Sequence, residues 1–459
     1  MGGTMKILLT GATGFVGRAI ARRLLLAGHQ LVLTSRSPEH AQKSFPLPVS
    51  GFVGWDPNAG PLPLGSLNGV EAVIHLAGES VSERWTEDRK RAIRESRILG
   101  TRHLTQSLRE EGASVRVALS ASAVGYYGDR EDEELLEGSA PGQGFLPQVC
   151  VDWENEWFSG VPVSARAAAL RIGIVLGRGG GALEKLLPIY RSGGGGPVGN
   201  GQQWMSWIHI EDLASQFLFA LENAAIRGPV NAVGPAPLRN EDFSKTLAKA
   251  MKVPSVLGAP AVAVKLLFGE MASIVLASQK VLPRAFEAAG FQFRFSTLEQ
   301  ALEDLSVADD LLEVDQFIPR PIAEVWPFFS EARNLEELTP PWLSFQVLKT
   351  SSPDLGEGTL IDYRLKLHGV PFKWTSRIEE WQPGKRFVDT QVRGPYALWH
   401  HTHTFESMGS GTLMRDRVRY RVPVGLLGRV VGGWKVENDV QRIFAFRRLK
   451  VRERFGQNG

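Results

Sequence analysis

The hydrophobic positions of the first 36 residues follow two different periods, which together predict a strand, a turn, a helix and a second strand. Residues 6–10 form a short apolar run of the kind seen in buried strands. Residues 18–26 repeat their apolar positions at helical spacing, and Gly28 follows where a helix commonly ends. Residues 31–36 return to an apolar strand pattern. We therefore predict a βαβ unit at the start of the chain.

The alternation of short apolar runs with helical segments continues to about residue 305. Strands are predicted at residues 51–56, 70–75, 115–122 and 169–177, and helices at residues 84–111 and 145–158. Strands that alternate with helices are typical of a parallel sheet with helices on both faces. The pattern predicts an α/β fold, a Rossmann-type doubly wound parallel sheet, over residues 1–305.

The pattern changes after about residue 310. Residues 312–319 alternate as a strand does, residues 321–329 predict a helix opened by proline, and residues 430–452 predict a long last helix. Six further strands are predicted between these helices, at residues 343–348, 359–367, 372–381, 386–391, 398–405 and 411–421. We therefore predict a second, α+β domain over residues 310–459.

Length and composition agree with two globular domains. The chain has 459 residues, 43% of them hydrophobic and 22% charged, which is typical of soluble proteins. The net charge of +3 gives no indication of a nucleic-acid partner. The apolar stretch at residues 253–277 contains two charged residues and two prolines, so we predict no membrane span. A single cysteine excludes an internal disulfide, and no secretory signal is visible, which together favour the cytoplasm.

The turn after the first strand contains Gly11, Gly14 and Gly17. A dinucleotide pyrophosphate needs backbone N–H groups that no side chain covers, at the positive end of a helix. Gly11 would allow the tight turn, Gly14 the approach of the phosphates, and Gly17 the packing of the helix on the strand. The alternative is a glycine-rich turn without a ligand. It is less favoured because the glycines lie between a predicted strand and a predicted helix.

The end of the second predicted strand indicates which nicotinamide cofactor the turn would bind. An acidic residue at this place usually binds a ribose 2′-hydroxyl, and an arginine binds a 2′-phosphate. Here the strand ends in Ser35 and Arg36, and no carboxylate follows before Glu39. This favours NADP(H). The alternative is that Arg36 is an ordinary solvated arginine.

The spacing Gly-x-x-Gly-x-x-Gly resembles the extended short-chain dehydrogenase/reductase family. The tail of the first domain, residues 281–305, resembles the nucleotide-sugar-epimerase-like subgroup, which ends in a small C-terminal domain of unknown function, here about residues 250–305. The resemblance implies a set of cofactor-binding residues in the turn, at the strand ends and in the loop after the fourth strand: Gly11, Thr13, Gly14, Phe15, Val16, Gly17, Ser35, Arg36, Asp56, Leu76, Ala77 and Gly78.

Two of these predictions have a specific structural alternative. In the resembled family an acidic residue at the position of Asp56 often contacts the adenine, but Asp56 precedes Pro57 and could simply start a turn. The loop after the fourth strand resembles the family's loop beneath the nicotinamide ribose. His75, just before that loop, is expected to be a hydrogen-bonded polar residue and not a base.

The proton-transfer residues of the resembled family are only partly present. Ser122 matches the family's Ser-Ser-x-x-x-Tyr-Gly segment, in which a serine hydroxyl holds the substrate oxygen; the alternative is a serine that caps the strand end. The family's Tyr-x-x-x-Lys is absent, and the matching helix positions hold Leu146 and Cys150. A phenol next to a positive charge releases its proton more readily. We therefore predict Ser122 and Tyr126 as the catalytic pair, and an inert core thiol at Cys150.

Residues 310–459 resemble the START-like (SRPBCC) helix-grip family, whose sheet wraps the last helix around an apolar ligand cavity. His401 and His403 would share the inner face, near Asp416 on the next strand. His-x-His can be metal-ligand spacing, but a hydrogen-bonded polar patch is favoured because no third ligand is assured, so no metal is predicted. The other face of the last strand is expected in solvent or against an acidic partner, and it carries Arg415, Arg417, Arg419 and Arg421.

Two hypotheses for function follow. The first is an NADP(H)-dependent oxidoreductase or epimerase-like enzyme that acts on a small molecule, with an apolar ligand in the fused cavity. The second is a non-catalytic NADP(H)-sensing module coupled to a ligand-binding or partner-binding domain, which the missing Tyr-x-x-x-Lys favours. The sequence leaves the substrate and the oligomeric state open.

Overall fold

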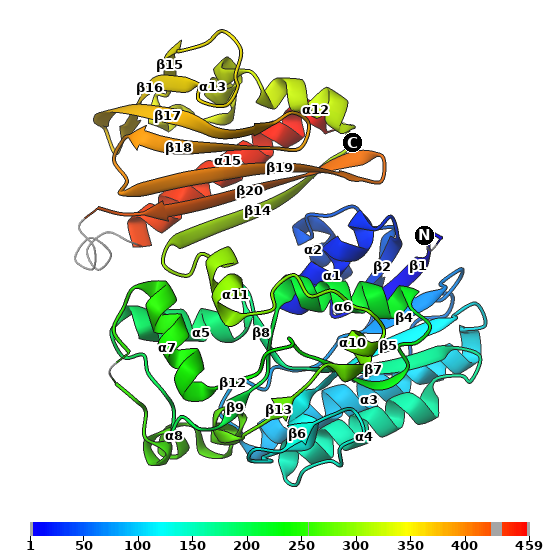
Figure 1. Cartoon of the computed structure of the whole chain (residues 1–459). Coiled ribbons are helices and arrows are strands. Elements are labelled where there is room, and N and C mark those ends of the chain that lie inside the picture. The colour runs from blue at the N-terminus through cyan, green and yellow to red at the C-terminus, as the bar shows by residue number, and fades with distance from the viewer. Residues whose placement is uncertain (1–2, 256, 424–433, 457–459) are drawn as a thin grey trace. The chain divides into compact units, whose positions relative to one another are not determined.

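The structure, a computed structural model, describes residues 3–255, 257–423 and 434–456. The contacts within the chain divide it after Ala308 into two compact units, and the second unit also includes Pro46–Pro48. Figure 1 shows a sheet flanked by helices in the first unit and a curved sheet with a long helix in the second.

The first unit is built on a parallel seven-stranded sheet. Its strand order is β11-β7-β5-β4-β1-β2-β3, with β1 (Lys6–Thr10), β2 (Gln30–Ser35), β3 (Gly51–Gly54), β4 (Ala72–His75), β5 (Val117–Ala123), β7 (Arg166–Ile172) and β11 (Gly228–Ala232). The order reverses between β1 and β4, and sheets of this kind bind ligands at the carboxyl ends of the strands where the reversal occurs. The predicted Rossmann-type α/β fold is confirmed.

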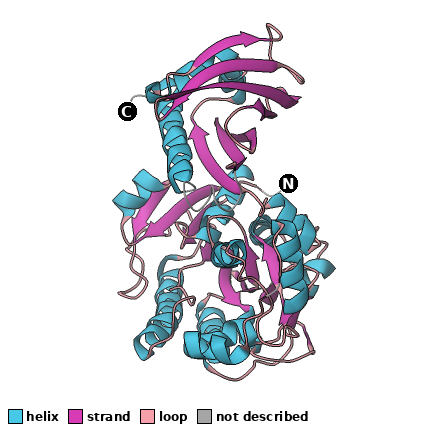
Figure 2. Ribbon diagram, turned by 90° about the vertical axis from the view of Figure 1, so that its left-hand side faces the viewer, coloured by secondary structure: helices cyan, strands magenta, loops and turns pink. Residues whose placement is uncertain are grey.

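Helices cover both faces of this sheet (Figure 2). The long helices pack in pairs, α1 against α6 and α3 against α4. The helices of the unit are α1 (Phe15–Leu26), α2 (Pro38–Ser44), α3 (Glu87–Glu111), α4 (Phe145–Gly160), α5 (Gly181–Arg191), α6 (Ile210–Glu222), α7 (Asn240–Met251), α8 (Ala261–Phe268), α9 (Ser273–Leu276), α10 (Arg284–Ala288) and α11 (Leu298–Asp304), with the short 3₁₀ helices η1 (Val124–Tyr127) and η2 (Gly269–Ala272).

Short strand pairs extend the unit beyond the main sheet. They are formed by β6 (Glu134–Leu135), β8 (Ile174–Leu176), β9 (Trp204–Met205), β10 (Trp207–His209), β12 (Leu238–Arg239) and β13 (Lys280–Val281). The prediction of a single strand at residues 169–177 is wrong, because this segment is divided into β7 and β8 at Gly173. A Cβ at Gly173 would lie 2.6 Å from the Ser206 carbonyl oxygen, so the chain passes too close to its neighbour there for a side chain.

The second unit is an antiparallel sheet with a helix against it. The strand order is β14-β20-β19-β18-β17-β16-β15, with β14 (Asp310–Ile318), β15 (Gln346–Thr350), β16 (Leu360–Leu367), β17 (Val370–Gln382), β18 (Arg386–Arg393), β19 (Leu398–Met408) and β20 (Gly411–Arg421). The helices are α12 (Ile322–Phe329), η3 (Ala332–Asn334), α13 (Leu335–Leu338), η4 (Pro341–Leu343) and α15 (Trp434–Phe455). The predicted start of the last helix, Val430, lies outside the described residues.

One side of α15 packs on the sheet and closes the core of the second unit. Val440 and Phe444 pack with Val418 and Tyr420 of β20. Further along α15, Val451 joins a cluster that contains phenylalanines of α12. A sheet that grips its last helix in this way is the architecture that the resemblance to the START-like family implied.

The four arginines of β20 meet acidic residues of the same unit. Arg415 and Arg417 lie opposite Asp315 and Glu313 in the register of β14 and β20 and form ion pairs with them. Arg419 and Arg421 both pair with Asp309, directly before β14. The expected solvated face therefore also carries ion pairs to the neighbouring strand and to the residue before it. The pairs of Arg415 and Arg417 are partly exposed, so each contributes roughly 0–1 kcal/mol, whereas Asp309 is buried between its two arginines.

We expect residues 309–459 to fold as a separate fragment, because the sheet, α12 and α15 bury their own core. A fragment that starts at Asp309 retains the partner of Arg419 and Arg421. It should show one cooperative thermal transition by circular dichroism and calorimetry. A gradual loss of signal would show that the two units share a core. The same fragment with Asp309→Asn should melt at a lower temperature.

Candidate functional site

The turn between β1 and α1 requires glycine at two positions for reasons internal to the fold. Gly11 has a φ of +69°, and a Cβ on it would lie 2.8 Å from the Leu76 carbonyl carbon. A Cβ on Gly17 would lie 2.2 Å from the Gly11 carbonyl oxygen. The backbones of β1, α1 and the loop after β4 are therefore pressed together at this point.

Gly14 differs from these two glycines because nothing in the described structure requires it. Its φ of −75° and ψ of 171° are open to any residue. A Cβ there would meet only the Gly11 carbonyl oxygen, at 3.4 Å. No side chain caps α1, and its first turn carries no acidic residue. A glycine that leaves room at the positive end of a helix fits the pyrophosphate of a dinucleotide.

A hydrogen-bonded clamp holds the loop after β4 against the turn. The Thr10 hydroxyl accepts from the backbone N–H groups of Leu76 and Ala77, at 3.0 and 3.2 Å. Its own proton is then available to His75 Nδ1, 2.8 Å away. Burial lowers the pKa of His75 to about 4, which keeps the ring neutral and able to accept this bond. His75 is thus a structural residue, as expected.

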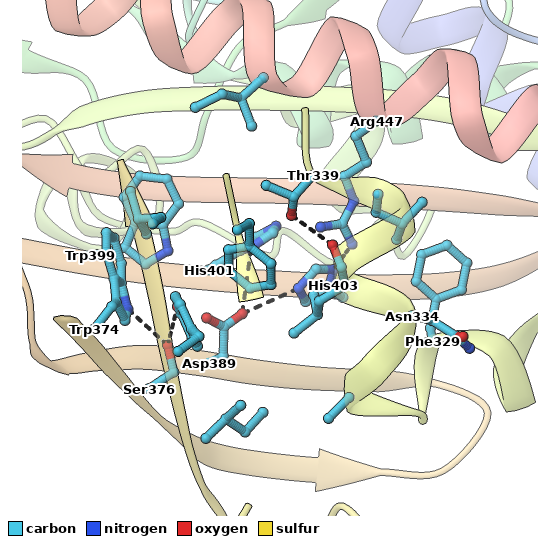
Figure 3. Close-up of a pocket in the computed structure, with 18 of the residues that line it drawn as sticks. Phe329, Asn334, Thr339, Trp374, Ser376, Asp389, Trp399, His401, His403 and Arg447 are labelled. Atoms are coloured by element: carbon cyan, nitrogen blue, oxygen red, sulfur yellow. Dashed lines mark hydrogen bonds and ion pairs between the residues drawn. The ribbon is translucent and has the colours of Figure 1, made fainter. Parts of the chain in front are cut away.

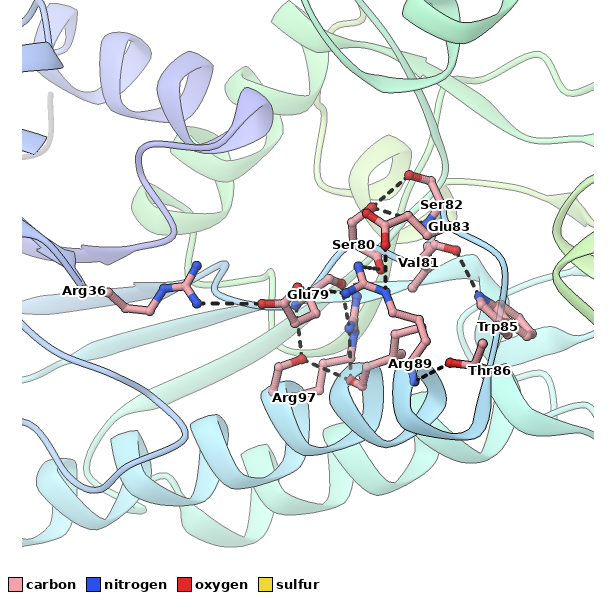
Figure 4. A network of polar contacts seen from close by, with 12 residues as sticks. Arg36, Glu79, Ser80, Val81, Ser82, Glu83, Trp85, Thr86, Arg89 and Arg97 are labelled. Carbon is pink, nitrogen blue, oxygen red and sulfur yellow. Dashed lines mark hydrogen bonds and ion pairs between the residues drawn. The ribbon is translucent and has the colours of Figure 1, made fainter. Parts of the chain in front are cut away.

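At the ends of β2 and β3, Arg36 and Asp56 are exposed and Ser35 is half-buried. Arg36 is 72% exposed, and its guanidinium lies 3.9 Å from the Glu79 carboxylate (Figure 4). The same carboxylate lies 3.3 Å from Arg89, so Arg36 is the second partner of an acid that already has one. The Ser35 hydroxyl accepts from the Ser37 N–H. Asp56 accepts from the Asn58 N–H at 3.0 Å, which is the turn-starting alternative considered above.

The remaining predicted cofactor residues line the same region. Thr13 is exposed in the turn, and Val16 is half-buried on the first turn of α1. Gly78 is exposed next to Arg97, which donates to the Glu79 carbonyl oxygen at 3.1 Å and so ties the loop after β4 to α3.

Phe15 fills a space that three glycines of the loop after β8 leave free. Cβ atoms at Gly177 and Gly180 would lie 2.5 and 2.4 Å from its ring, and one at Gly181 would lie 3.0 Å away. The loop after β8 therefore packs directly against an aromatic ring of the turn between β1 and α1.

Ser122 lies in a buried ionic network. Its hydroxyl donates to Glu154 Oε1 at 2.7 Å. Arg171 donates to both oxygens of the same carboxylate, at 2.8 and 2.7 Å. Ser122, Glu154 and Arg171 are all buried. The predicted catalytic serine is therefore already bonded to a carboxylate.

The two tyrosines of η1 have different surroundings. The Tyr127 hydroxyl is buried, donates to Asn231 at 2.6 Å and accepts from Arg171 at 2.9 Å. Burial raises the pKa of Tyr127 to about 12, despite Arg171. Tyr126 is only half-buried, and the Arg171 guanidinium carbon lies 3.5 Å from its ring centroid. Tyr126 is therefore the tyrosine that a substrate could reach.

The positions of the family's Tyr-x-x-x-Lys are taken by apolar side chains that face η1. A Cβ at Gly125 would lie 3.6 Å from Leu146 and 3.9 Å from Cys150. Burial raises the pKa of Cys150 to about 12, so the thiol is neutral and unreactive. The structure gives neither position a group that could transfer a proton.

The second unit contains a cavity of about 150 Å³ between the sheet and α15. Apolar and aromatic side chains form most of its wall, among them Trp374, Trp399 and Phe444. One part of the wall is polar and contains Asp389, His401, His403 and Arg447 (Figure 3).

Sequence reasoning missed Asp389 and Arg447, although it named both histidines. Asp389 is the direct partner of His401 across β18 and β19. The alternation along β18 could have found it, since Asp389 lies two residues from the buried Phe387. Arg447 comes from α15, and only the packing of that helix brings it to the cavity.

Comparison with known proteins identifies three segments. Residues 7–233 match the NAD dependent epimerase/dehydratase family. An epimerase family protein from Arabidopsis thaliana, the chloroplastic SDR39U1 homolog, is 37% identical over 308 residues, 65% of this chain and 86% of that protein. The chain belongs to the NAD-dependent epimerase/dehydratase family. Residues 259–305 match a domain of unknown function, DUF1731, and residues 318–444 match the polyketide cyclase/dehydrase and lipid transport family.

Further relatives of this epimerase family support the same assignment. The epimerase family protein Mb2239 of Mycobacterium bovis is 36% identical over 299 residues, 64% of this chain and 96% of that protein. The crystal structure of human SDR39U1 isoform 2, solved with NADPH, is 33% identical and has a TM-score of 0.59. It covers 66% of this chain and 99% of its own. The resemblances to the extended dehydrogenases and to the START-like proteins are confirmed.

In the part of the chain that the structure describes, no helix combines the length and apolar character needed to cross a membrane.

We expect Gly14→Val to abolish binding of a nicotinamide dinucleotide without unfolding the protein. The valine side chain fits the free space above Gly14, where the pyrophosphate would approach the backbone. Calorimetric titration should show no binding, while the melting temperature stays near that of the wild type. Gly17→Ala is the matched control, because its Cβ overlaps the Gly11 carbonyl and should lower the melting temperature. Unchanged affinity in folded Gly14→Val would show that the turn has only a structural role.

Proposed function

We propose that the first unit binds NADP(H) and acts as an oxidoreductase or epimerase-like enzyme on a small molecule, and that the cavity of the second unit holds an apolar ligand. The space above Gly14 at the uncapped end of α1 is the observation that carries the cofactor assignment. NADP(H), when bound, supplies or accepts a hydride. Binding of the substrate and transfer of its proton would be done by side chains of this protein.

The choice of NADP(H) over NAD(H) rests on the end of β2. Arg36 is exposed and holds Glu79 only through a contact of 3.9 Å, so its guanidinium can turn to a 2′-phosphate. An arginine binds a phosphate through charge-assisted, often bidentate hydrogen bonds. The human relative crystallised with NADPH supports the same choice.

Tyr126 is the proposed proton donor and acceptor. Tyr126 lies in η1, directly after β5, and its side chain is half-buried. The Arg171 guanidinium carbon lies 3.5 Å from its ring centroid, so Arg171 holds the phenol in place. Ser122 would have to release Glu154 before it could donate to a substrate oxygen, so it is the weaker half of the proposed pair.

A non-catalytic NADP(H) sensor is the second candidate, and the helix α4 favours it. Leu146 and Cys150 occupy the places of the usual tyrosine and lysine, and Ser122 is bonded to Glu154. A sensor would bind the cofactor and pass the signal to the ligand-binding unit without turnover. Consumption of NADPH or of a sugar nucleotide across a broad substrate panel separates the two candidates.

We expect Arg36→Asp to remove most of the preference for NADP(H). A lost charge-assisted contact is worth about 1.5–3 kcal/mol, which corresponds to roughly a 10- to 150-fold weaker Kd for NADPH. Calorimetric titration of both cofactors measures the change. Arg91→Asp is the control, because Arg91 is a similarly exposed arginine on α3. Equal affinity of the wild-type protein for NADPH and NADH would contradict the assignment.

We expect Tyr126→Phe to lower turnover by about 10²- to 10⁴-fold and to leave cofactor affinity unchanged, because only the proton-bearing hydroxyl is lost. The neighbouring Tyr127→Phe is the control. It removes a buried hydroxyl bonded to Asn231 and should lower the melting temperature instead. Full turnover in Tyr126→Phe would eliminate this role for the residue.

A further inference from the structure

Three side chains in the cavity of the second unit present ligand atoms to one point. Asp389 lies on β18, and His401 and His403 lie on β19, two residues apart on the inner face. Asp389 Oδ2 lies 3.4 Å from His401 Nδ1 and 3.3 Å from His403 Nε2 (Figure 3). Among the described residues, no other group of three His, Cys, Asp or Glu side chains brings its ligand atoms within 4.8 Å of one another.

The two separations that involve Asp389 agree with those of a tetrahedral metal site. Zinc bonds to histidine nitrogen and carboxylate oxygen are about 2.0–2.2 Å long. Two such bonds at the tetrahedral angle place their ligand atoms about 3.3–3.5 Å apart. The observed distances of Asp389 to the two histidines, 3.4 and 3.3 Å, fall at this value. They are long for hydrogen bonds between a charged pair.

The nitrogens on the other side of each ring are held by a second carboxylate. Asp416 Oδ1 lies 3.0 Å from His401 Nε2 and 2.8 Å from His403 Nδ1. The guanidinium of Arg447 lies 3.6 Å from the other oxygen of Asp416. Metal-binding histidines almost always donate their free N–H to such a carboxylate, which fixes the tautomer and the ring orientation.

Both rings approach Asp416 more closely than Asp389, so His401 Nδ1 and His403 Nε2 are the atoms turned toward Asp389. The contact of His403 Nε2 with Asp389, at 3.3 Å, is also within hydrogen-bond distance. The substitutions below therefore separate a metal site from a hydrogen-bonded patch.

We propose that Asp389, His401 and His403 bind a divalent transition-metal ion of the zinc type, with Asp416 as the residue that orients both histidines. Two imidazoles and one carboxylate suit zinc and its neighbours, whereas magnesium and calcium prefer oxygen ligands alone. Three protein ligands leave one coordination position free, which is the arrangement of a reactive or ligand-binding zinc site. The third ligand that the sequence could not assure is Asp389.

All three ligands line the cavity, so a molecule in the cavity can reach the free position, and this defines the ligand class. The cavity wall next to the histidines contains Trp399 and Phe444. The ligand would therefore have an aromatic or apolar body and one oxygen or nitrogen donor that completes the coordination of the metal. This deepens the ligand-binding role proposed for the second unit. Because the test below uses metal ions alone, it can fail while the cavity still binds an apolar ligand.

The test uses the untagged full-length chain, stripped of metal with a chelator and titrated with Zn²⁺ against a chromophoric competitor. We expect one equivalent of tightly bound Zn²⁺, with no competition from Mg²⁺. Co²⁺ in the same site should give the visible absorption bands of a tetrahedral complex. Zn²⁺ should also raise the melting temperature, because only the folded protein has the site.

Substitutions separate a metal site from a hydrogen-bonded polar patch. Asp389→Asn and His403→Gln should each weaken Zn²⁺ binding by at least 100-fold and remove the Co²⁺ bands. His400→Gln is the matched control, because His400 lies on the same strand but faces away from the cavity toward Glu379. Asp416→Asn should weaken binding by about 10- to 100-fold and shift the Co²⁺ spectrum without abolishing it, as expected of a positioning residue.

Two outcomes would overturn the proposal. One is a wild-type protein that binds no Zn²⁺ at micromolar concentration and shows no tetrahedral Co²⁺ bands. The other is equal Zn²⁺ affinity in folded Asp389→Asn and His400→Gln, which would leave a hydrogen-bonded patch as the explanation. If the cavity variants fail to fold, the Co²⁺ spectrum of the wild-type chain alone decides.

Discussion

A buried ion pair between Arg171 and Glu154 determines how the end of the parallel sheet is arranged in the first unit. The guanidinium and the carboxylate form two parallel hydrogen bonds inside the core, which fix α4 in position against β7. Removing one partner of such a pair leaves an uncompensated buried charge, at a cost of about 3–5 kcal/mol. Ser122 and Tyr127 form hydrogen bonds with the same pair, so both hydroxyls already have partners inside the core. In the proposed enzyme, proton transfer has to use groups that the ion pair leaves free.

The sequence was sufficient for those parts of the fold that depend on local pattern and backbone geometry. The order of strands and helices and the glycine turn follow from periodicity and from residues that are close in the chain, and the helix-gripping sheet was implied by the family resemblance. The division of residues 169–177 at Gly173 could not be predicted locally, because it depends on the carbonyl of Ser206, which is distant in the chain. The same holds for Ser122, whose partner lies on α4. The predicted cofactor residues gather around the turn and the adjoining strand ends, and their contacts with a ligand stay predictions.

In the second unit the sequence identified the inner-face histidines and aspartate of β19 and β20, but not what surrounds them. Whether two histidines form a polar patch or part of a metal site depends on a third ligand, and that ligand comes from β18. Asp389 and His401 are paired by the register of two antiparallel strands, which a single sequence does not specify. Arg447 arrives on α15, after a segment outside the described residues. Both units thus place their polar groups through long-range pairing, while their apolar patterns are visible locally.

The packing of Phe15 has a consequence for how this site can vary among relatives. The ring lies in a space that exists only because positions 177, 180 and 181 carry no side chain. A larger residue at any of the three would collide with the ring, and the ring belongs to the turn that a dinucleotide would contact. Positions 15 and 180 are therefore expected to covary, because the three atoms nearest to a Cβ at Gly180 all belong to Phe15. Gly177 and Gly181 are constrained further, since a Cβ there would also meet Ile210 at 3.0 Å and the Val175 carbonyl oxygen at 2.7 Å. The turn after β1 and the loop after β8 should then diversify as one unit.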